Sequence, residues 1–313
     1  MDQLNYIIKR VLQIIPVLLI ITILIFIMIR LIPGDPATVL LGDKATPELV
    51  AALKHKMGLD KPIYLQYLIF MKNLLTMNMG DSLLFIVPVS DLLKERLVLT
   101  GLLTFIAAIF SVLISFPLGY IAGTNKDNAK DTAIRTGTLV ALSMPQFWVG
   151  LLLLMLFGVE LRWLPVAGWG DTWPEHIKSL ILPALTQALT TSALLTRNLR
   201  NNVVDVLQMD YVDFARSKGL KEGVVRHRHV IRNALITTVT LLSMQMAYML
   251  GGSIIIETVF ALPGVGALMV QAIFSRDYAV VQAVVFVFAF FVLLVNLITD
   301  ISYSFLDPRV RLE

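Results

Sequence analysis

Six long apolar stretches constrain this chain more than any other feature of its sequence. An α-helix needs roughly 20 predominantly apolar residues to cross the hydrocarbon core of a bilayer, because it rises only about 1.5 Å per residue. The stretches that contain no Asp, Glu, Lys, Arg or His are Val11–Ile29, Leu97–Asn125, Thr136–Val159, Ser179–Thr196, Asn233–Ile256 and Tyr278–Thr299. The sequence therefore predicts an all-α membrane protein with six transmembrane helices.

The composition agrees with a membrane protein and excludes several kinds of site. Only 15% of the 313 residues are charged, whereas a soluble domain carries about 25%, so membrane lipid is the expected surrounding of most of the chain. The chain has no cysteine, which excludes disulfides, thiolate metal sites and cysteine nucleophiles. Basic loops between apolar stretches account for the net charge of +4, and we expect no nucleic-acid partner.

The basic residues are concentrated in alternate loops. With the N-terminus inside, the inner segments carry 15 Lys and Arg, and the two short outer loops, 160–178 and 257–277, carry three. Because Lys and Arg accumulate in cytoplasmic loops, we expect both termini to be cytoplasmic. The outer segment 30–96 carries eight, but segments longer than about 60 residues largely escape this rule.

That long outer segment is predicted to form a helical cap. Thr46 can cap a helix that begins with Pro47 and contains Glu48 in its first turn, and Gly58 can end it. After Pro62, residues 63–75 are predicted to form a second amphipathic helix on the outer membrane surface. The expected organisation is residues 1–30 for the N-terminal region and first span, 31–95 for the extracytoplasmic cap, 96–300 for a core of five spans, and 301–313 for a cytoplasmic tail.

A short helix is predicted inside the basic inner segment Arg197–Arg232. Asp210 can cap it, Lys218 lies in its last turn, and Gly219 can adopt the left-handed conformation that ends it. Leu207, Tyr211 and Phe214 share one face of this helix. Two interpretations are open at this point: a helix that rests on the bilayer surface, or a helix that docks into a groove on a soluble partner.

Polar residues recur at helical spacing inside two of the predicted spans. Gln187 and Thr191 lie four residues apart in the fourth span, and Thr238, Gln245 and Gly252 lie seven apart in the fifth. Each set shares one helix face. They either line a wet translocation path or form hydrogen bonds between packed helices.

Glycine motifs predict close packing and turns. Gly119 and Gly123 form a Gly-x-x-x-Gly pattern that permits the close approach of two helices. Gly251–Gly252 and Leu262–Gly266 are either points where the backbone bends during gating or, for the second, an ordinary tight outer turn.

The sequence provides no sign of an intrinsic energy source or of catalysis. No Gly-x-x-x-x-Gly-Lys-Ser/Thr motif is present, so no Walker A nucleotide site is expected. The six stretches lack ionisable residues, which weakens the hypothesis of an ion-coupled carrier. All four histidines lie outside the stretches, so an intramembrane enzyme is the weakest alternative. We therefore predict no catalytic residues and no metal site, and interpret His227 and His229 as part of a solvated basic turn.

Motifs along nearly the whole chain resemble the inner-membrane permease subunits of ATP-binding-cassette importers, and among them the dipeptide, oligopeptide, glutathione and nickel permeases. The segments that carry this resemblance are Ile32–Pro36, Met57–Pro62, Ser143–Trp148, Trp163–Pro165, Ile181–Ala184, Gly251–Glu257, Pro263–Gly266, Ser275–Tyr278 and Asp307–Arg311. The resemblance implies a type I importer permease fold in a bacterial inner membrane.

The most specific part of the resemblance is the Ala-x-x-x-Gly motif at Ala215–Gly219, followed by Ile231–Leu235. In this family the motif lies in the coupling helix that docks on the ATPase, which places that helix near residues 205–222. The acidic residue and paired alanines of the general motif are absent, and Ile236–Thr238 replaces a proline that usually follows. The second departure puts a bend at the start of the fifth span in doubt.

The resemblance also implies roles for side chains in and around this motif. Tyr211 and Phe214 would be apolar anchors, and Arg216 and Lys218 would meet acidic groups on the ATPase. The implied partners are a second, homologous permease, two cytoplasmic ATP-binding subunits that hold ATP and Mg, and an extracytoplasmic solute-binding protein. No cofactor is therefore expected in this chain.

The resemblance leaves the cargo open among short peptides, glutathione, nickel and metal chelates. The short outer loop Glu160–Lys178 and the sequence Ala272–Tyr278 favour the nickel-type members. The alternative function is an ion-coupled secondary transporter that acts without an ATPase.

Overall fold

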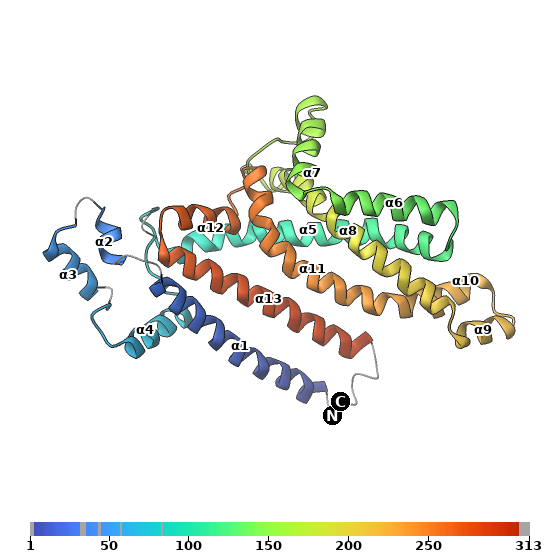
Figure 1. Ribbon diagram of the computed structural model, residues 1–313, viewed down its shortest axis with the longest axis horizontal. Helices are drawn as coiled ribbons and strands as arrows, with labels where there is room; N and C mark the ends of the chain where they lie inside the picture. The colour runs from blue at the N-terminus through green and yellow to red at the C-terminus, as the bar shows by residue number, and fades with distance from the viewer. Residues whose placement is uncertain (1–2, 32–35, 43–44, 57, 83, 307–313) are drawn as a thin grey trace.

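The computed structural model describes residues 3–31, 36–42, 45–56, 58–82 and 84–306, and it is helical over most of them (Figure 1). The helices of the N-terminal part are α1 (Gln3–Leu31), α2 (Pro36–Leu41), α3 (Pro47–Lys56) and α4 (Ile63–Leu75). Those of the middle part are α5 (Val89–Thr124), α6 (Ala129–Ser143), α7 (Gln146–Leu153), the π-helix η2 (Leu154–Glu160) and α8 (Trp173–Leu207). The rest are α9 (Asp210–Ser217), α10 (Glu222–Val224), the π-helix η3 (Val225–Ile231), α11 (Arg232–Val259), α12 (Val265–Phe274) and α13 (Tyr278–Leu306).

Within this description, five helices are long and apolar enough to cross a membrane, and a bent helix pair can supply a sixth span. The third predicted span is sharply bent, because α6 and the α7–η2 helix meet at 101°. The bend lies at Met144 and Pro145. Proline disfavours the helical conformation in the residue before it, and Met144 is accordingly extended, with φ −87 and ψ 131.

The two cap helices form where the sequence predicts them. Thr46 Oγ1 accepts a hydrogen bond from the Leu49 backbone N–H at 3.3 Å, and the second predicted helix coincides with α4. Helix α4 is attached to the first span, because the Thr22 and Tyr67 hydroxyls lie 2.9 Å apart and the Phe26 and Tyr67 rings meet edge to face. Helix α4 therefore packs against α1.

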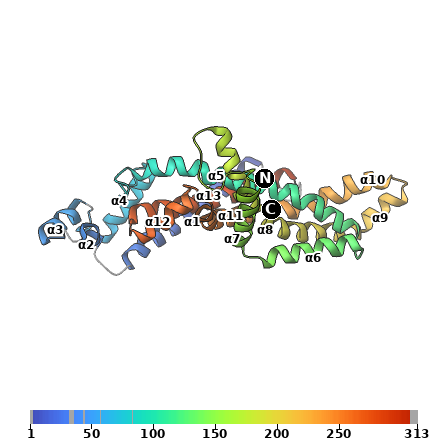
Figure 2. The same cartoon turned by 90° about the horizontal axis from the view of Figure 1, so that it is seen from above.

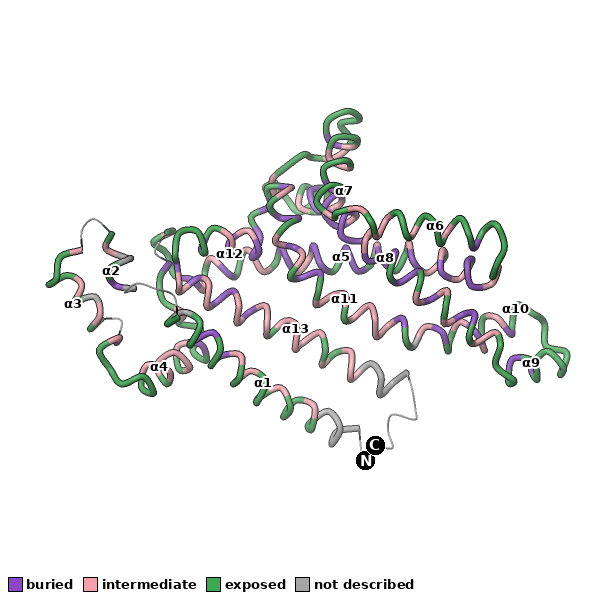
Figure 3. The backbone as a smooth tube through the Cα atoms, in the orientation of Figure 1, coloured by how far each residue is buried: buried purple, intermediate pink, exposed green. Residues whose placement is uncertain are grey.

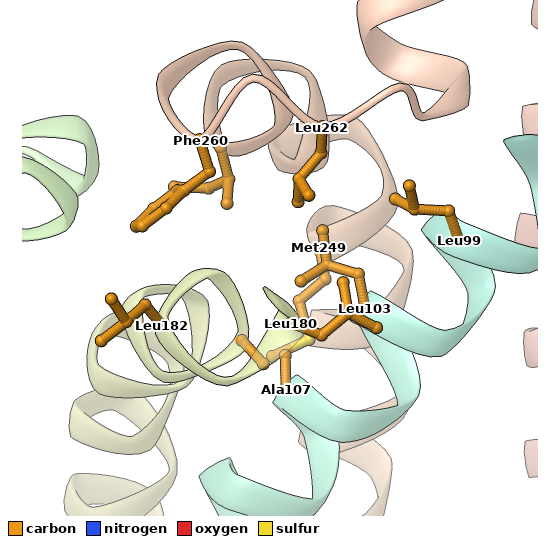
Figure 4. Close-up of a cluster of buried hydrophobic side chains, with 10 residues drawn as sticks. Leu99, Leu103, Ala107, Leu180, Leu182, Met249, Phe260 and Leu262 are labelled. Atoms are coloured by element: carbon orange, nitrogen blue, oxygen red, sulfur yellow. The ribbon is translucent and has the colours of Figure 1, made fainter. Parts of the chain in front are cut away.

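Helices α5 and α8 form the packed centre of the molecule, and Figure 3 shows their buried residues. The pattern at Gly119 and Gly123 serves this contact: an added Cβ would lie 2.9 Å from Leu199 Cβ at the first position and 2.6 Å from Val203 Cβ at the second. Helix α6 is held to the same pair by Arg200, whose Nη2 lies 2.6 Å from Asp131 Oδ2. A cluster of side chains from α5, α8 and α11 extends the core (Figure 4).

The cap and the short inner helices lie at opposite ends of the long axis. Helices α2 to α4 occupy one end and α9 and α10 the other, in both views (Figures 1 and 2). Helices α1 and α13 lie side by side, with Arg10 Nη1 3.3 Å from Asp300 Oδ2. The start of α1 and the end of α13 both point away from the cap (Figure 1).

Replacing Gly123 with alanine is expected to lower the free energy of unfolding by about 1–3 kcal/mol, because the added methyl group would overpack the α5–α8 contact. Gly101 on the same helix is the matched control, since no neighbouring element lies within 4 Å of its Cβ position. Gly101→Ala should be neutral or should gain up to about 1 kcal/mol from helix propensity. Thermal unfolding in detergent compares the two variants, and equal losses would contradict the close packing.

Candidate functional site

The short helix predicted in the inner segment is present as α9, and it is anchored by one face. Val212 is fully buried and Ala215 nearly so. They pack in a cluster with Leu199, Val203, Val225, Val230 and Ala234 from α8, η3 and α11. An eight-residue helix is too short to be stable alone, so this cluster is what holds α9 in place.

The two ends of α9 are formed differently from one another. The residue before the helix is Met209, which makes no side-chain cap, so the prediction of Asp210 as the cap is wrong by one position. Asp210 and Asp213 instead lie in the first turn, where negative charge is favoured by the helix dipole. The last turn is closed by two backbone hydrogen bonds, from Gly219 to Arg216 O at 2.9 Å and from Leu220 to Ala215 O at 3.4 Å.

That pair of hydrogen bonds is a Schellman motif, which requires a left-handed residue directly after the helix cap. Gly219 provides it with a φ of +79, as the sequence predicts. No atom lies within 4 Å of a Cβ built at Gly219. A side chain there would therefore be disfavoured by backbone strain and not by a clash.

The opposite face of α9 presents aromatic side chains to the outside. Phe214 is 60% exposed and Tyr211 41% exposed, whereas Leu207, predicted on the same face, packs against the buried cluster. Lys218 Nζ lies 4.5 Å from the centroid of the Phe214 ring. The exposed surface of α9 thus combines an apolar ring with a cation above it.

Arg216 is engaged inside the chain. Its guanidinium lies 3.0 Å from Asp213 Oδ1 and 3.2 Å from Glu222 Oε1, and Arg226 Nε approaches the same carboxylate at 3.0 Å. The hydrogen bonds that Arg216 donates to the Glu222 carboxylate are the main cause that raises the pKa of Arg216. Arg216 therefore ties α9 to α10 in this structure, in addition to any contact it makes with another protein.

A second connection links α9 to the start of α11. Asn233 Nδ2 donates to the Tyr211 hydroxyl at 3.0 Å and to His229 O at 2.7 Å. Sequence reasoning did not find the roles of Asn233 and Glu222. The position of Asn233 inside the Ile231–Leu235 motif could have indicated its role. The ion pairs of Glu222 could not be predicted, because they depend on the geometry of the turn between α9 and α10.

Two of the polar residues predicted in the spans lie in the contact between α8 and α11. Gln187 is fully buried and donates to Met249 O at 3.5 Å. Thr238 donates to Ala234 O at 3.2 Å and lies 3.4 Å from Asn198 Oδ1. Thr191 is also buried, and Gln245 and Gly252 are partly exposed on α11. The structure thus places the α8 and α11 sets on two helices that pack against each other.

The chain matches two protein families. It matches "Binding-protein-dependent transport system inner membrane component" over residues 115–312 and "Binding-prot-dependent transport system membrane comp, N-term" over residues 3–83. A putative peptide transport system permease protein of Brucella abortus (strain 2308) is 39% identical over 310 residues, which cover 98% of this chain and 99% of the relative. A glutathione transport system permease protein of Salmonella typhi is 37% identical over 309 residues, 99% of both chains.

Solved structures show the same fold at low sequence identity. A chain of the inward-facing MetNI methionine ABC transporter has a TM-score of 0.59 and 16% identity, over 69% of this chain and 96% of the other. A chain of an amino acid ABC transporter with histidines has a TM-score of 0.51 and 18% identity, over 67% and 92%.

The two faces of α9 are expected to respond differently to truncation. Val212→Ala should lower the free energy of unfolding by about 2 kcal/mol, because it removes buried methyl groups and leaves a cavity. Phe214→Ala should change it by no more than about 0.5 kcal/mol, since the ring is largely exposed. Denaturation of the purified chain in detergent measures both, and a larger loss for Phe214→Ala would refute this assignment of faces.

Proposed function

This chain belongs to the family of binding-protein-dependent transport system inner membrane components, and from that membership we propose the assembly in which it works. It is the inner-membrane permease subunit of an ATP-binding-cassette importer. It pairs with a second, homologous permease and with two cytoplasmic ATP-binding subunits, which hold ATP and Mg. An extracytoplasmic solute-binding protein delivers the cargo.

The observation that carries the coupling role is the division of α9 into an anchored face and an exposed aromatic face. Val212 and Ala215 fix the helix to α8, η3 and α11, so force applied to α9 is transmitted to two spans. Phe214 presents an exposed ring that a groove on a soluble partner can bury. Of the two interpretations of this helix, docking on the ATPase explains why it is both rigidly held and apolar outside.

The orientation that follows from this role agrees with the charge distribution. Placing α9 in the cytoplasm puts the segment 197–232 and its eight Lys and Arg on the inner side. The cap helices, at the other end of the molecule (Figure 1), then face the binding protein. Both termini are cytoplasmic in this arrangement.

Short peptides, with glutathione among them, are the cargo class that we propose. The support is the naming of two full-length relatives, one as a peptide permease and one as a glutathione permease. The preference of the sequence for nickel-type members stays a prediction. An ion-coupled carrier is not proposed, because the relatives and the fold are those of importer permeases.

Phe214→Ala tests the docking role directly. Exposed aromatic anchors dominate many interfaces, and truncating one costs about 2 kcal/mol or more of binding free energy. We expect at least a tenfold loss of ATPase co-purification from detergent-solubilised membranes, with normal insertion of the permease. The control is Tyr248→Ala, which truncates an aromatic residue of α11 that is 72% exposed, compared with 60% for Phe214. Equal co-purification of both variants would overturn the proposal.

Gly219 provides an independent test of the same helix. Gly219→Val places a β-branched residue in the left-handed region, at a cost of about 1–3 kcal/mol, and should reduce ATPase binding and cargo uptake in proteoliposomes. Gly219→Asn should retain most of both activities, because asparagine tolerates this conformation. If valine and asparagine behave alike, the shape of the α9 terminus does not matter for coupling.

A further inference from the structure

Helix α11 connects the α9 region to the opposite end of the molecule. Together with α10 and η3 it forms a helical segment of 38 residues, Glu222–Val259, which spans about 57 Å at the rise of an α-helix. At one end, Asn233 contacts Tyr211 of α9. At the other end, Glu257 is completely buried, directly after an apolar stretch without charge.

Glu257 joins three helices at one point. Its Oε1 accepts a hydrogen bond from Thr100 Oγ1 of α5 at 2.7 Å, and its Oε2 accepts from the Ala267 N–H of α12 at 2.9 Å. Thr100 Oγ1 in turn accepts from the Val265 N–H at 2.9 Å. Two N–H groups in the first turn of α12, which have no partner within their own helix, are thus bound by side chains of α11 and α5.

The turn before α12 is shaped around this carboxylate. A Cβ added to Gly264 would lie 2.2 Å from Glu257 Cδ, and one added to Gly266 would lie 2.7 Å from Ile254 Cα. Both glycines are therefore required by close approach to α11. The segment Leu262–Gly266 is a turn whose shape fits the Glu257 side chain. The sequence alone left open whether this segment is a point where the backbone bends or an ordinary tight turn.

A carboxylate is a costly way to pack two helices together. A buried charge is tolerated only where hydrogen bonds replace its hydration, and the bonds of Glu257 are complete only while α12 and α5 keep their positions around it. Displacing α12 from α11 and α5 would leave the Val265 and Ala267 N–H groups and Oε2 of the carboxylate unpaired at once. Such a contact favours joint movement of α11 and α12 over any intermediate arrangement.

We propose that Glu257 is a positioning residue that makes α12 follow α11 during transport, so that movement begun at α9 reaches the end of the permease that faces the binding protein. The proposal rests on the proposed function. Both oxygens of Glu257 accept hydrogen bonds inside the protein, and the proposal requires no transfer of a proton or an ion.

The test uses the complete importer, with both permeases, both ATPases and the binding protein, in proteoliposomes with a short peptide as cargo. Glu257→Gln replaces one acceptor by a donor. We expect ATPase co-purification as in the unmodified complex and ATP hydrolysis within twofold of it, while the peptide taken up per ATP falls at least tenfold. Thr258→Ala is the matched control, since Thr258 is exposed and bonds only its own helix, at Ile254 O.

Thr100→Val extends the test to the second member of the contact. It should lower the uptake per ATP in the same direction as Glu257→Gln, and the double variant should be no worse than the more impaired single variant, because the two side chains act through one contact. If Glu257→Gln fails to assemble, Thr100→Val alone decides the outcome, as it removes only the hydroxyl. Normal uptake per ATP in the assembled variant overturns the proposal.

A structural readout separates positioning from simple destabilisation. Since the chain has no cysteine, spin labels can be attached through cysteines introduced at Gln271 of α12 and Lys94 of α5, both exposed. In the unmodified complex the distance distribution should be narrow and should stay narrow and unshifted on ATP binding, because the Glu257 contact holds α5, α11 and α12 together. In Glu257→Gln it should be broad or should shift on ATP binding. A narrow distribution in Glu257→Gln that ATP does not change would refute the inference, whereas absence of ATP-driven uptake by the unmodified complex would refute the proposed function itself.

Discussion

Backbone hydrogen bonding is the constraint on which this structure depends, because the interior of a bilayer offers no water to an unpaired N–H or C=O. Hydrogen bonds within regular helices satisfy most of these groups. The groups that need other partners lie where helices begin and end. At the turn before α12 the freed N–H groups are taken up by Glu257 and Thr100. At the end of α9 the freed C=O groups of Ala215 and Arg216 accept hydrogen bonds from the Leu220 and Gly219 N–H groups in the Schellman motif. Both sites therefore lie at helix termini.

These two sites lie at opposite ends of one structural path. Helix α9 contacts the start of α11 through Tyr211 and Asn233, and the far end of α11 carries the contact with α12 and α5. Between them, α8 and α11 are joined by hydrogen bonds from Gln187 to Met249 O and from Thr238 to Asn198. The π-helix η3 lies within this path, and π-helical turns inside helices are frequent at functional sites.

The sequence predicted the features that depend on residues close to one another in the chain. The cap at Thr46, the extent of α4, the left-handed Gly219 and the close packing at Gly119 and Gly123 all follow from residue type and spacing. The sharp bend in the third span was not foreseen, because a proline inside a span is compatible with a kinked helix as well as with the break at Pro145. Glu257 was not found, since its partners lie 157 and 10 residues away in the chain and only the folded turn brings them together.

The internal ion pairs of Arg216 bear on the proposed role of α9 as a coupling helix. A surface ion pair contributes little to stability, about 0–1 kcal/mol, so the contacts of Arg216 with Asp213 and Glu222 do not hold the helix in place by themselves. They do fix the direction of a long side chain next to Phe214, and they leave Lys218 as the cation above the exposed ring. The buried cluster around Val212 thus holds α9 in place. The charged residues around Phe214 determine which partner surface the ring can bind. A coupling helix needs both properties, because a partner can move the spans only through an element that is both recognised and firmly attached.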